Sequence, residues 1–340
     1  MPITLKDIAR RTGYSVSTIS RVLNGVGENY RISAKTRLMI ERIANEMNYQ
    51  PNQVARGLRL KKTHAIGLVI PDISNPFFAH VSRSIQIGMY ESGYILIVCN
   101  TDENQETEIE QIQLLRNKGV DGFIIMPVGL KSQHISELVE SKVPVVLLDR
   151  CFDDISTNSV LVDNYNGSMK AVEYLLESGH RRIAVIQGLT KTSTNDQRIK
   201  GYLDAHKKYK VDVDKNLIVG KDYRRENGYI ETKYLLNMKN PPSVIYSTSD
   251  LITLGVLDAV FEEKLRIPDD ISLVSFDDID YAPYLISPLT AVRQPWEIMG
   301  EIAVKLLLQE IKSSGQMEKS RIELKPTLNI RKSVKKLGNP

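Results

Sequence analysis

The sequence predicts a small all-α head followed by an α/β body of two doubly wound lobes, each with a parallel sheet at its centre. Residues 1–62 contain 12 Lys and Arg but only 4 Asp and Glu, a net charge of +8 in a chain whose total is +4. Apolar residues recur at helical spacing in the first 50 residues, whereas from His64 onward apolar runs of strand length alternate with helical stretches. We therefore expect the basic head to meet a polyanion, with nucleic acid as the first candidate.

The composition of the 340-residue chain is that of a globular protein, since 42% of its residues are hydrophobic and 25% are charged. No apolar run approaches the ~18 residues of a membrane span, and charged residues occupy the place of a secretory signal, so we expect a cytoplasmic protein with no membrane partner. Cys99 and Cys151 show no metal-binding spacing, so neither a metal nor a cofactor is expected. Both cysteines are interpreted as small buried hydrophobic residues.

Three helices are expected in the head, over residues 5–12, about 15–24 and about 33–47, with N-cap candidates at Thr4 and Ser15 and a glycine after the first helix. Each helix has apolar residues on one face only, namely Leu5, Ile8 and Ala9, then Ile19, Val22 and Leu23, then Ile40, Ile43, Ala44 and Met47. Two short helices joined by a glycine-containing turn predict a helix-turn-helix, whose second helix enters the DNA major groove.

The outward face of the second helix carries the candidate DNA contacts. Its members are Val16, Ser17, Thr18, Ser20 and Arg21. Arg21 could contact guanine with two hydrogen bonds, whereas Val16 offers only methyl contact to thymine. Ser15, Thr18, Ser20 and Asn24 are better suited to phosphate. The alternative is an ordinary solvated helix face, which the basic charge of the head disfavours.

The body alternates strands with helices in two halves of similar length. Strands are expected at about residues 65–70, 94–99, 122–126, 143–148, 183–187, 243–247 and 272–276, and helices at 78–92, 107–118, 167–178, 195–209, 227–238 and 250–263. Near-continuously apolar strands indicate parallel sheets covered on both faces. Ligands bind outside the carboxyl ends of such strands, so we expect a ligand site in a cleft between the two lobes.

The loops after these strands have the chemistry of a sugar site. They contain the adjacent aromatics Phe77 and Phe78 and the polar residues Asp149, Arg150, Asn164, Arg198, Ser249, Asp250, Asp277 and Asp278. Carboxylates and guanidinium groups can chelate vicinal hydroxyls, while an aromatic face covers the apolar side of a sugar ring. For each residue taken alone, the alternative is a helix cap or a turn.

Eight segments of the chain resemble the lac/gal repressor (LacI/GalR) family. They are LKDIA (5–9), SVSTISRVLN (15–24), YQPNQVARGL (49–58), IGLVIPDISNPFF (66–78), GVDG (119–122), GHRRI (179–183), FDD (276–278) and PLTAVRQP (288–295). The resemblance covers nearly the whole chain and implies a helix-turn-helix domain at 1–50, a hinge helix and linker at 51–63, and an effector-binding and dimerisation domain at 64–340. One departure is the loop of residues 25–32, which is longer than usual and places the acidic Glu28 near the expected phosphates.

The linker is expected to act as a switch. Helices below ~12 residues are marginal in water, so residues 52–58 should fold only on DNA. The resemblance implies that the hinge helix pairs with that of a dimer partner in the minor groove and inserts Leu58 between base pairs. The implied hinge contacts are Asn52, Ala55, Arg56, Leu58 and Arg59. The alternative for Leu58 is an ordinary linker residue that packs on the body.

The resemblance implies a periplasmic-binding-protein-like body, with one lobe at about 64–163 and 293–323 and the other at about 164–292 and 324–340. Arg198, Ser249 and Asp277 match effector-contacting positions, and Phe77 and Tyr223 match positions that stack on the effector; Phe78 and Asn164 complete the predicted site. The family commonly has asparagine where this chain has Ser249. Val81, Ile85, Met89, Leu285 and Ile286 are candidates for a dimer interface, with core packing as the alternative.

The implied function is that of a homodimeric, ligand-responsive repressor that reads a pseudo-palindromic double-stranded operator and responds to a sugar or sugar derivative. A purine or nucleoside effector is the alternative ligand. A transport-type sugar-binding protein would share the body but not the basic head. An enzyme is disfavoured, because no GxGxxG, GxxxxGK[ST], GxSxG or HExxH motif occurs.

Overall fold

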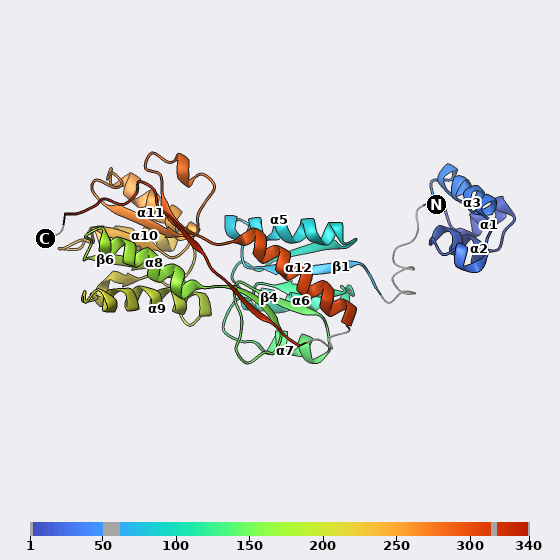
Figure 1. Ribbon diagram of the computed structural model, residues 1–340, viewed down its shortest axis with the longest axis horizontal. Helices are drawn as coiled ribbons and strands as arrows, with labels where there is room; N and C mark the ends of the chain where they lie inside the picture. The colour runs from blue at the N-terminus through green and yellow to red at the C-terminus, as the bar shows by residue number, and fades with distance from the viewer. Residues whose placement is uncertain (1–2, 50–61, 314–317, 339–340) are drawn as a thin grey trace. The chain divides into compact units, whose positions relative to one another are not determined.

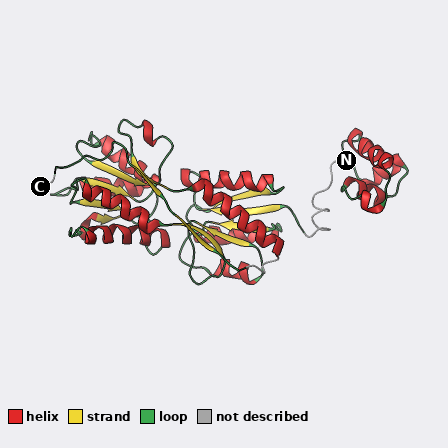
Figure 2. Cartoon of the chain, in the orientation of Figure 1, coloured by secondary structure: helices red, strands yellow, loops and turns green. Residues whose placement is uncertain are grey.

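The computed structural model describes residues 3–49, 62–313 and 318–338. Its contacts divide the chain into two units, residues 1–63 and 64–340 (Figure 1). The first unit is helical and the second is α/β, as Figure 2 shows. The predicted fold class, an all-α head and a body of two doubly wound lobes, is therefore confirmed.

The head contains α1 (Leu5–Thr12), α2 (Val16–Leu23), the 3₁₀ turn η1 (Glu28–Tyr30) and α3 (Ala34–Glu46). The helix ends follow the expected capping residues: Thr4 and Asp7 form a capping box, and the hydroxyl of Ser15 accepts the backbone N–H of Thr18. Gly13 ends α1 in the left-handed region at φ 75°. The core consists of Ile8, Ile19, Val22, Ile40 and Ala44, and the other predicted apolar positions pack around it.

The first sheet of the body has the strand order β11-β5-β4-β3-β1-β2, with every pair parallel. Its strands are β1 (Ala65–Ile70), β2 (Ile95–Asn100), β3 (Gly122–Ile125), β4 (Val145–Leu148), β5 (Asn158–Val162) and β11 (Arg321–Leu324). One apolar cluster joins it to α5 (Pro76–Glu91) and α12 (Trp296–Ser313), which lie side by side in Figure 1. A second cluster, on the other face, joins it to α6 (Gln105–Asn117) and α7 (Gln133–Glu140).

The second sheet repeats this plan in the order β12-β10-β9-β8-β6-β7, with only β12 antiparallel among its described pairs. Its strands are β6 (Ile183–Ile186), β7 (Ile218–Val219), β8 (Val244–Ser247), β9 (Ser272–Phe276), β10 (Thr290–Arg293) and β12 (Thr327–Asn329). The covering helices are α8 (Asn164–Glu177) with α9 (Ser193–Lys208), and α10 (Arg225–Leu236) with α11 (Asp250–Glu262); short 3₁₀ turns are η2 (Lys215–Leu217) and η3 (Ala282–Tyr284). The chain passes between the sheets after β5, β10 and β11.

Some element boundaries differ from those expected. Five body helices begin two or three residues earlier than their apolar spacing indicates. In α5 and α8, for example, the polar N-caps Asn75 and Asp163 start the first turn before the apolar stripe does. Strands β5, β7, β10, β11 and β12 were not among the expected runs; each is short. Cys99 and Cys151 are half-buried rather than fully buried, which corrects their interpretation as core residues. None of the described helices combines the length and the apolar character needed to cross a membrane.

Candidate DNA-binding face and effector pocket

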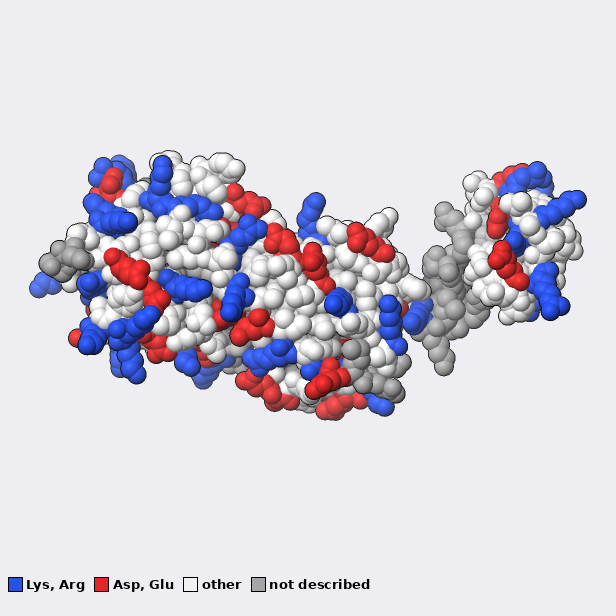
Figure 3. Space-filling view, in the orientation of Figure 1, with Lys and Arg blue, Asp and Glu red and all other residues white. Residues whose placement is uncertain are grey.

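The outward face of α2 exposes Ser15, Val16, Ser17 and Arg21, while Thr18, Ser20 and Asn24 are half-buried. The side chains of Ser15 and Thr18 are hydrogen-bonded to each other, and the Asn24 amide donates to the backbone and hydroxyl oxygens of Ser20. These pairs stabilise the two ends of α2. The N-terminus of α2, which attracts phosphate through its helix dipole, is left exposed. Basic side chains on the visible surface of the head are seen in Figure 3.

The longer loop after α2 holds two charged side chains in place. The guanidinium carbon of Arg21 lies 3.9 Å from the ring centroid of Tyr30, a cation–π contact. Nη1 of Arg37 lies 2.5 Å from Oε1 of Glu28, so the acid that seemed to oppose phosphate binding has a cationic partner. Thus Tyr30 of the loop supports Arg21, and Arg37 of α3 partly neutralises Glu28. The hinge residues Asn52, Ala55, Arg56, Leu58 and Arg59 lie outside the described residues.

A pocket opens where the carboxyl ends of strands from both sheets meet, as expected for this topology. It is lined by Asn75, Phe77, Phe78, Glu103, Asp149, Arg150, Thr194, Arg198, Tyr223, Ser249, Asp277 and Gln294. The space not filled by protein atoms is about 310 Å³, but only about 20 Å³ admits the centre of a water molecule. The walls are therefore nearly in contact, and a ligand larger than water must move them apart.

The structure brings six predicted effector residues together in this pocket: Phe77, Phe78, Arg198, Tyr223, Ser249 and Asp277. Asn164 does not line the pocket itself, but its Oδ1 accepts a hydrogen bond from Nε of Arg198, which does. The predicted set lacked Asn75, Glu103, Asp149, Arg150, Thr194 and Gln294. Asp149 and Arg150 had been noted as loop residues, and Asn75 and Glu103 also follow expected strands. Thr194 lies inside α9 and Gln294 follows a strand that was not expected, so no such signal marked these two residues.

Arg198 is held rigidly against the second lobe. Its Nε donates to Oδ1 of Asn164 at 2.8 Å and its Nη1 donates to the carbonyl of Thr248 at 2.5 Å. The guanidinium carbon lies 3.7 Å from the ring centroid of Phe276. Burial raises the pKa values of the nearby Asp149 and Asp277 carboxyls, and the buried charge of Arg198 opposes part of that rise. This arrangement orients a fixed cation into the pocket.

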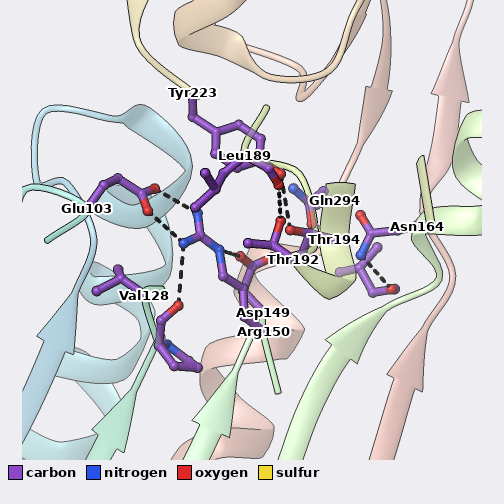
Figure 4. Close-up of polar contacts among 12 residues, drawn as sticks. Glu103, Val128, Asp149, Arg150, Asn164, Leu189, Thr192, Thr194, Tyr223 and Gln294 are labelled. Atoms are coloured by element: carbon purple, nitrogen blue, oxygen red, sulfur yellow. Dashed lines mark hydrogen bonds and ion pairs between the residues drawn. The ribbon is translucent and has the colours of Figure 1, made fainter. Parts of the chain in front are cut away.

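Arg150 is the corresponding cation of the first lobe, and Figure 4 shows its pairing with Glu103. Its Nη1 and Nη2 donate to the two carboxylate oxygens of Glu103, each at 2.7 Å. The guanidinium carbon lies 5.9 Å from the ring centroid of Phe78 and 5.3 Å from that of Tyr223. Burial alone would lower the pKa of Arg150, but the charge and hydrogen bonds of Glu103 raise it overall. Arg150 therefore stays charged and occupies the space between two aromatic walls.

Three buried carboxyls lie in or beside the pocket. Burial raises the pKa of Asp149 to about 6, against the opposing effects of Arg150 and Arg198. Burial also raises the pKa values of Asp250 and Asp277, whose charges repel each other. Unpaired buried oxygens remain on Asp149 (Oδ1), Asp250 (Oδ2) and Gln294 (Oε1) among the described residues. The pocket thus holds excess acceptor capacity that a ligand with hydroxyl groups can use.

Contacts across the pocket join the two lobes. The amide of Asn75 in the first lobe donates to Oδ1 of Asp250 in the second at 2.8 Å. Nε2 of His80 lies 3.3 Å from Oδ2 of Asp280. Both contacts join the first lobe to the second, so a ligand that changes the separation of the lobes will also change these contacts.

Several candidates have structural roles instead. Asp278 forms a two-oxygen ion pair with Arg331, at 2.7 and 2.8 Å, and does not line the main pocket. Val81, Ile85 and Met89 are fully buried in the core of the first lobe, so the core alternative is correct for them. Within the described part of the chain, no group of three or more His, Cys, Asp or Glu residues is placed to hold a metal ion.

The fold and pocket define a class of protein: a helix-turn-helix unit joined to a two-lobed ligand-binding unit. Residues 4–52 match the family described as bacterial regulatory proteins, lacI family. Residues 63–332 match periplasmic binding proteins and sugar binding domain of LacI family. The chain belongs to the LacI family of bacterial transcriptional regulators.

Individual relatives match most or nearly all of the chain. The ribose operon repressor of Haemophilus influenzae is 34% identical over 97% of this chain and 98% of its own. The crystal structure of the lac repressor dimer bound to operator and an anti-inducer has a TM-score of 0.85 at 27% identity, covering 98% of this chain and 100% of that one. A LacI family regulator from Enterococcus faecium with bound ribose has a TM-score of 0.72 at 28% identity, covering 80% and 99%.

Proposed function

We propose that this regulator is a homodimeric repressor whose affinity for a pseudo-palindromic operator is controlled by a monosaccharide bound between the lobes of its body. The observation that carries the proposal is the pocket at the meeting point of both sheets, with aromatic walls and two buried guanidinium groups facing buried carboxyls. No catalytic step is part of this function. The proposed domain boundaries remain 1–50, 51–63 and 64–340.

The chemistry of the pocket favours a sugar over a purine. Unpaired carboxylate and amide oxygens need several hydrogen-bond donors, which the hydroxyls of a sugar supply. Only about 20 Å³ of the pocket admits the centre of a water molecule before its walls move apart, so we propose a single ring rather than a larger ligand. The ribose operon repressor of H. influenzae and the ribose-bound regulator of E. faecium support a pentose.

We propose that DNA reading depends on the N-terminal half of α2. Arg21 would contact a guanine, Val16 and Ser17 neighbouring bases, and Ser15, Thr18, Ser20 and Asn24 the phosphates. Two heads related by two-fold symmetry require two similar half-sites, which is why the operator should be nearly palindromic. The dimeric lac repressor on its operator supports this assembly.

The exposed apolar residues of the first lobe support a dimer. Ile87 and Tyr90 of α5 and Ile95 and Val98 of the edge strand β2 are all exposed in the single chain. Covering such residues is the usual reason for self-association of an otherwise polar surface. We propose that this surface, rather than Val81, Ile85 and Met89, contributes to the interface.

We propose that effector binding changes the separation of the lobes and thereby the spacing of the two hinge segments. The hinge contacts that the family resemblance implies are Asn52, Ala55, Arg56, Leu58 and Arg59, and Leu58 would wedge between base pairs. A Leu58→Ala protein should bind operator less tightly while binding the effector normally. Equal operator affinity, measured by fluorescence anisotropy, would remove the wedge from the mechanism.

The central test combines ligand and DNA binding on the full chain. Thermal unfolding with D-ribose and with hypoxanthine should show a higher Tm with the sugar only, because a ligand bound by the folded state alone stabilises it. Operator fragments selected from genomic DNA should then show a sugar-dependent change in affinity of about 5- to 150-fold. A higher Tm with hypoxanthine and not with sugars would show that the effector is a purine rather than a sugar.

A further inference from the structure

We infer that the effector of this regulator carries no negative charge and that Glu103 is the residue that excludes anionic sugars. The inference rests on the proposed function and specifies the ligand class of the same pocket. It separates free sugars from sugar phosphates and sugar acids, which present similar rings with an added charge.

The charge balance of the pocket disfavours an anion. Its lining contains the carboxyls of Glu103, Asp149 and Asp277 against the guanidinium groups of Arg150 and Arg198. With all five groups ionised, the lining carries one more negative than positive charge. A phosphate or carboxylate brought into this small space would add to the excess of negative charge, and like charges placed together across an interface oppose binding strongly.

Arg150 has no free pair of N–H groups for an anion, and Arg198 already uses its Nε and one hydrogen of Nη1 within the protein. The Glu103 carboxylate accepts hydrogen bonds from Nη1 and Nη2 of Arg150, at 2.7 Å each, and the Arg150 side chain is only 7% exposed. Arg198 uses Nε for Asn164 and Nη1 for the Thr248 carbonyl. A ligand oxyanion would have to displace the Glu103 carboxylate, which already has the two-point geometry that arginine prefers.

The unpaired buried atoms also call for a ligand that donates hydrogen bonds. Within the described lining, two acceptors lack a partner, Oδ1 of Asp149 and Oε1 of Gln294, against one donor, Nε of Arg150. A hydroxyl group can donate to either acceptor, whereas an ionised phosphate or carboxylate oxygen only accepts. The requirement for donors and the charge balance therefore point to the same class of ligand.

The backbone holds Glu103 in this position against its conformational preference. Asp102 and Glu103 both lie in the left-handed region, at φ 53° and 55°, which non-glycine residues rarely occupy in succession. The backbone N–H of Glu103 donates to the carbonyl of Pro71, and the Asn100 amide donates to Asp102. Backbone strain of this kind clusters at ligand sites, and here it sets the position of a residue that lines the pocket.

The test compares sugars in matched pairs on the full chain. D-Ribose is compared with D-ribose 5-phosphate, and D-galactose with D-galacturonate, by isothermal titration calorimetry at pH 7.5. The neutral member of a binding pair should bind at least about tenfold more tightly, given the cost of like charges in one site. An anionic member that binds as tightly as its neutral partner overturns the inference but leaves a sugar effector in place. If none of the four sugars binds, both the proposed sugar effector and this inference are overturned.

Glu103→Gln isolates the role of this carboxylate. Glutamine keeps the side-chain length and one acceptor for Arg150 but removes the negative charge. The preference for the neutral sugar should fall by about tenfold or more, with the anionic member gaining affinity. Glu110→Gln, which removes an exposed carboxylate from α6, the helix that follows Glu103, should leave the preference unchanged. An unchanged preference in Glu103→Gln would exclude Glu103 as the discriminating residue.

Discussion

Replacing Asp149 by asparagine should stabilise the ligand-free protein at neutral pH, although Asp149 lies in the effector pocket. The carboxyl is buried, its Oδ1 has no partner in the described part of the chain, and its Oδ2 lies 3.7 Å from Nε of Arg150. Burial raises its pKa from 3.8 to about 6, against the attraction of Arg150 and Arg198 and with added repulsion from Asp277 and Glu103. The folded protein therefore holds a proton that the unfolded chain releases at lower pH.

The sign and size of the effect follow from this difference. Because the pKa is raised in the folded state, the stability linked to protonated Asp149 is fully present below pH 3.8 and is lost as the pH rises through about 6. The difference between the folded and unfolded pKa values of Asp149 corresponds to a free energy of about 3 kcal/mol, at about 1.4 kcal/mol per pKa unit. Asparagine does not ionise. The variant should thus unfold with a free energy larger by about 1 kcal/mol at pH 4.5 and about 3 kcal/mol above pH 7.

Urea unfolding of the ligand-free protein, followed by the fluorescence of Trp296 at pH 4.5 and 7.5, measures this difference. Asp212→Asn, which removes an exposed carboxylate, serves as the control. The same Asp149→Asn protein should lose affinity for D-ribose, since a binding site exchanges stability for function. A variant that is less stable than wild type at pH 7.5, or equally stabilised at both pH values, would refute the reasoning.

Three further predictions concern the pocket, the head and the packing of α10 on α11. Arg198→Ala should lower the affinity for D-ribose at least ~30-fold in calorimetry, because removing one partner of a buried charged network costs ~2 kcal/mol or more. Lys200→Ala, on the exposed face of α9, should leave the affinity unchanged. Unchanged isotherms for Arg198→Ala would remove Arg198 from the site. Arg21→Ala should weaken operator binding by ~1–3 kcal/mol in fluorescence anisotropy and relax selectivity at one base pair; an equal loss on random DNA would make Arg21 a phosphate contact only. Gly255→Ala should destabilise the protein by ~1–3 kcal/mol in urea, since its Cβ would lie 2.0 Å from a carbonyl oxygen of α10. Gly338→Ala, with open space around it, is the control, and equal midpoints for the two variants would contradict the close helix contact.

Local patterns were sufficient for the head helices, for most of the body helices, for seven of the twelve described strands and for half of the pocket. The helices of the head follow from apolar spacing and from caps such as Ser15, and both signals act within four residues of chain. Phe77, Arg198 and Asp277 could be chosen because each follows a strand of a doubly wound sheet, where the carboxyl ends converge. Glu103 follows a strand too, but a lone acid at a helix start has the common alternative of a helix cap.

Which side chains meet in the pocket depended on the packing of the two sheets. Glu103 and Arg150 are 47 residues apart, and Asn75 and Asp250 are 175 apart, so no local pattern relates the members of either pair. Their contacts arise because the strand order brings the loops after β2 and β4 to one edge, and because the two sheets face each other there. Short-range preferences thus account for the helices, strands and candidate loops. Burial, ion pairing and the charge balance of the pocket are long-range properties, since they depend on every group that the fold brings within a few ångströms.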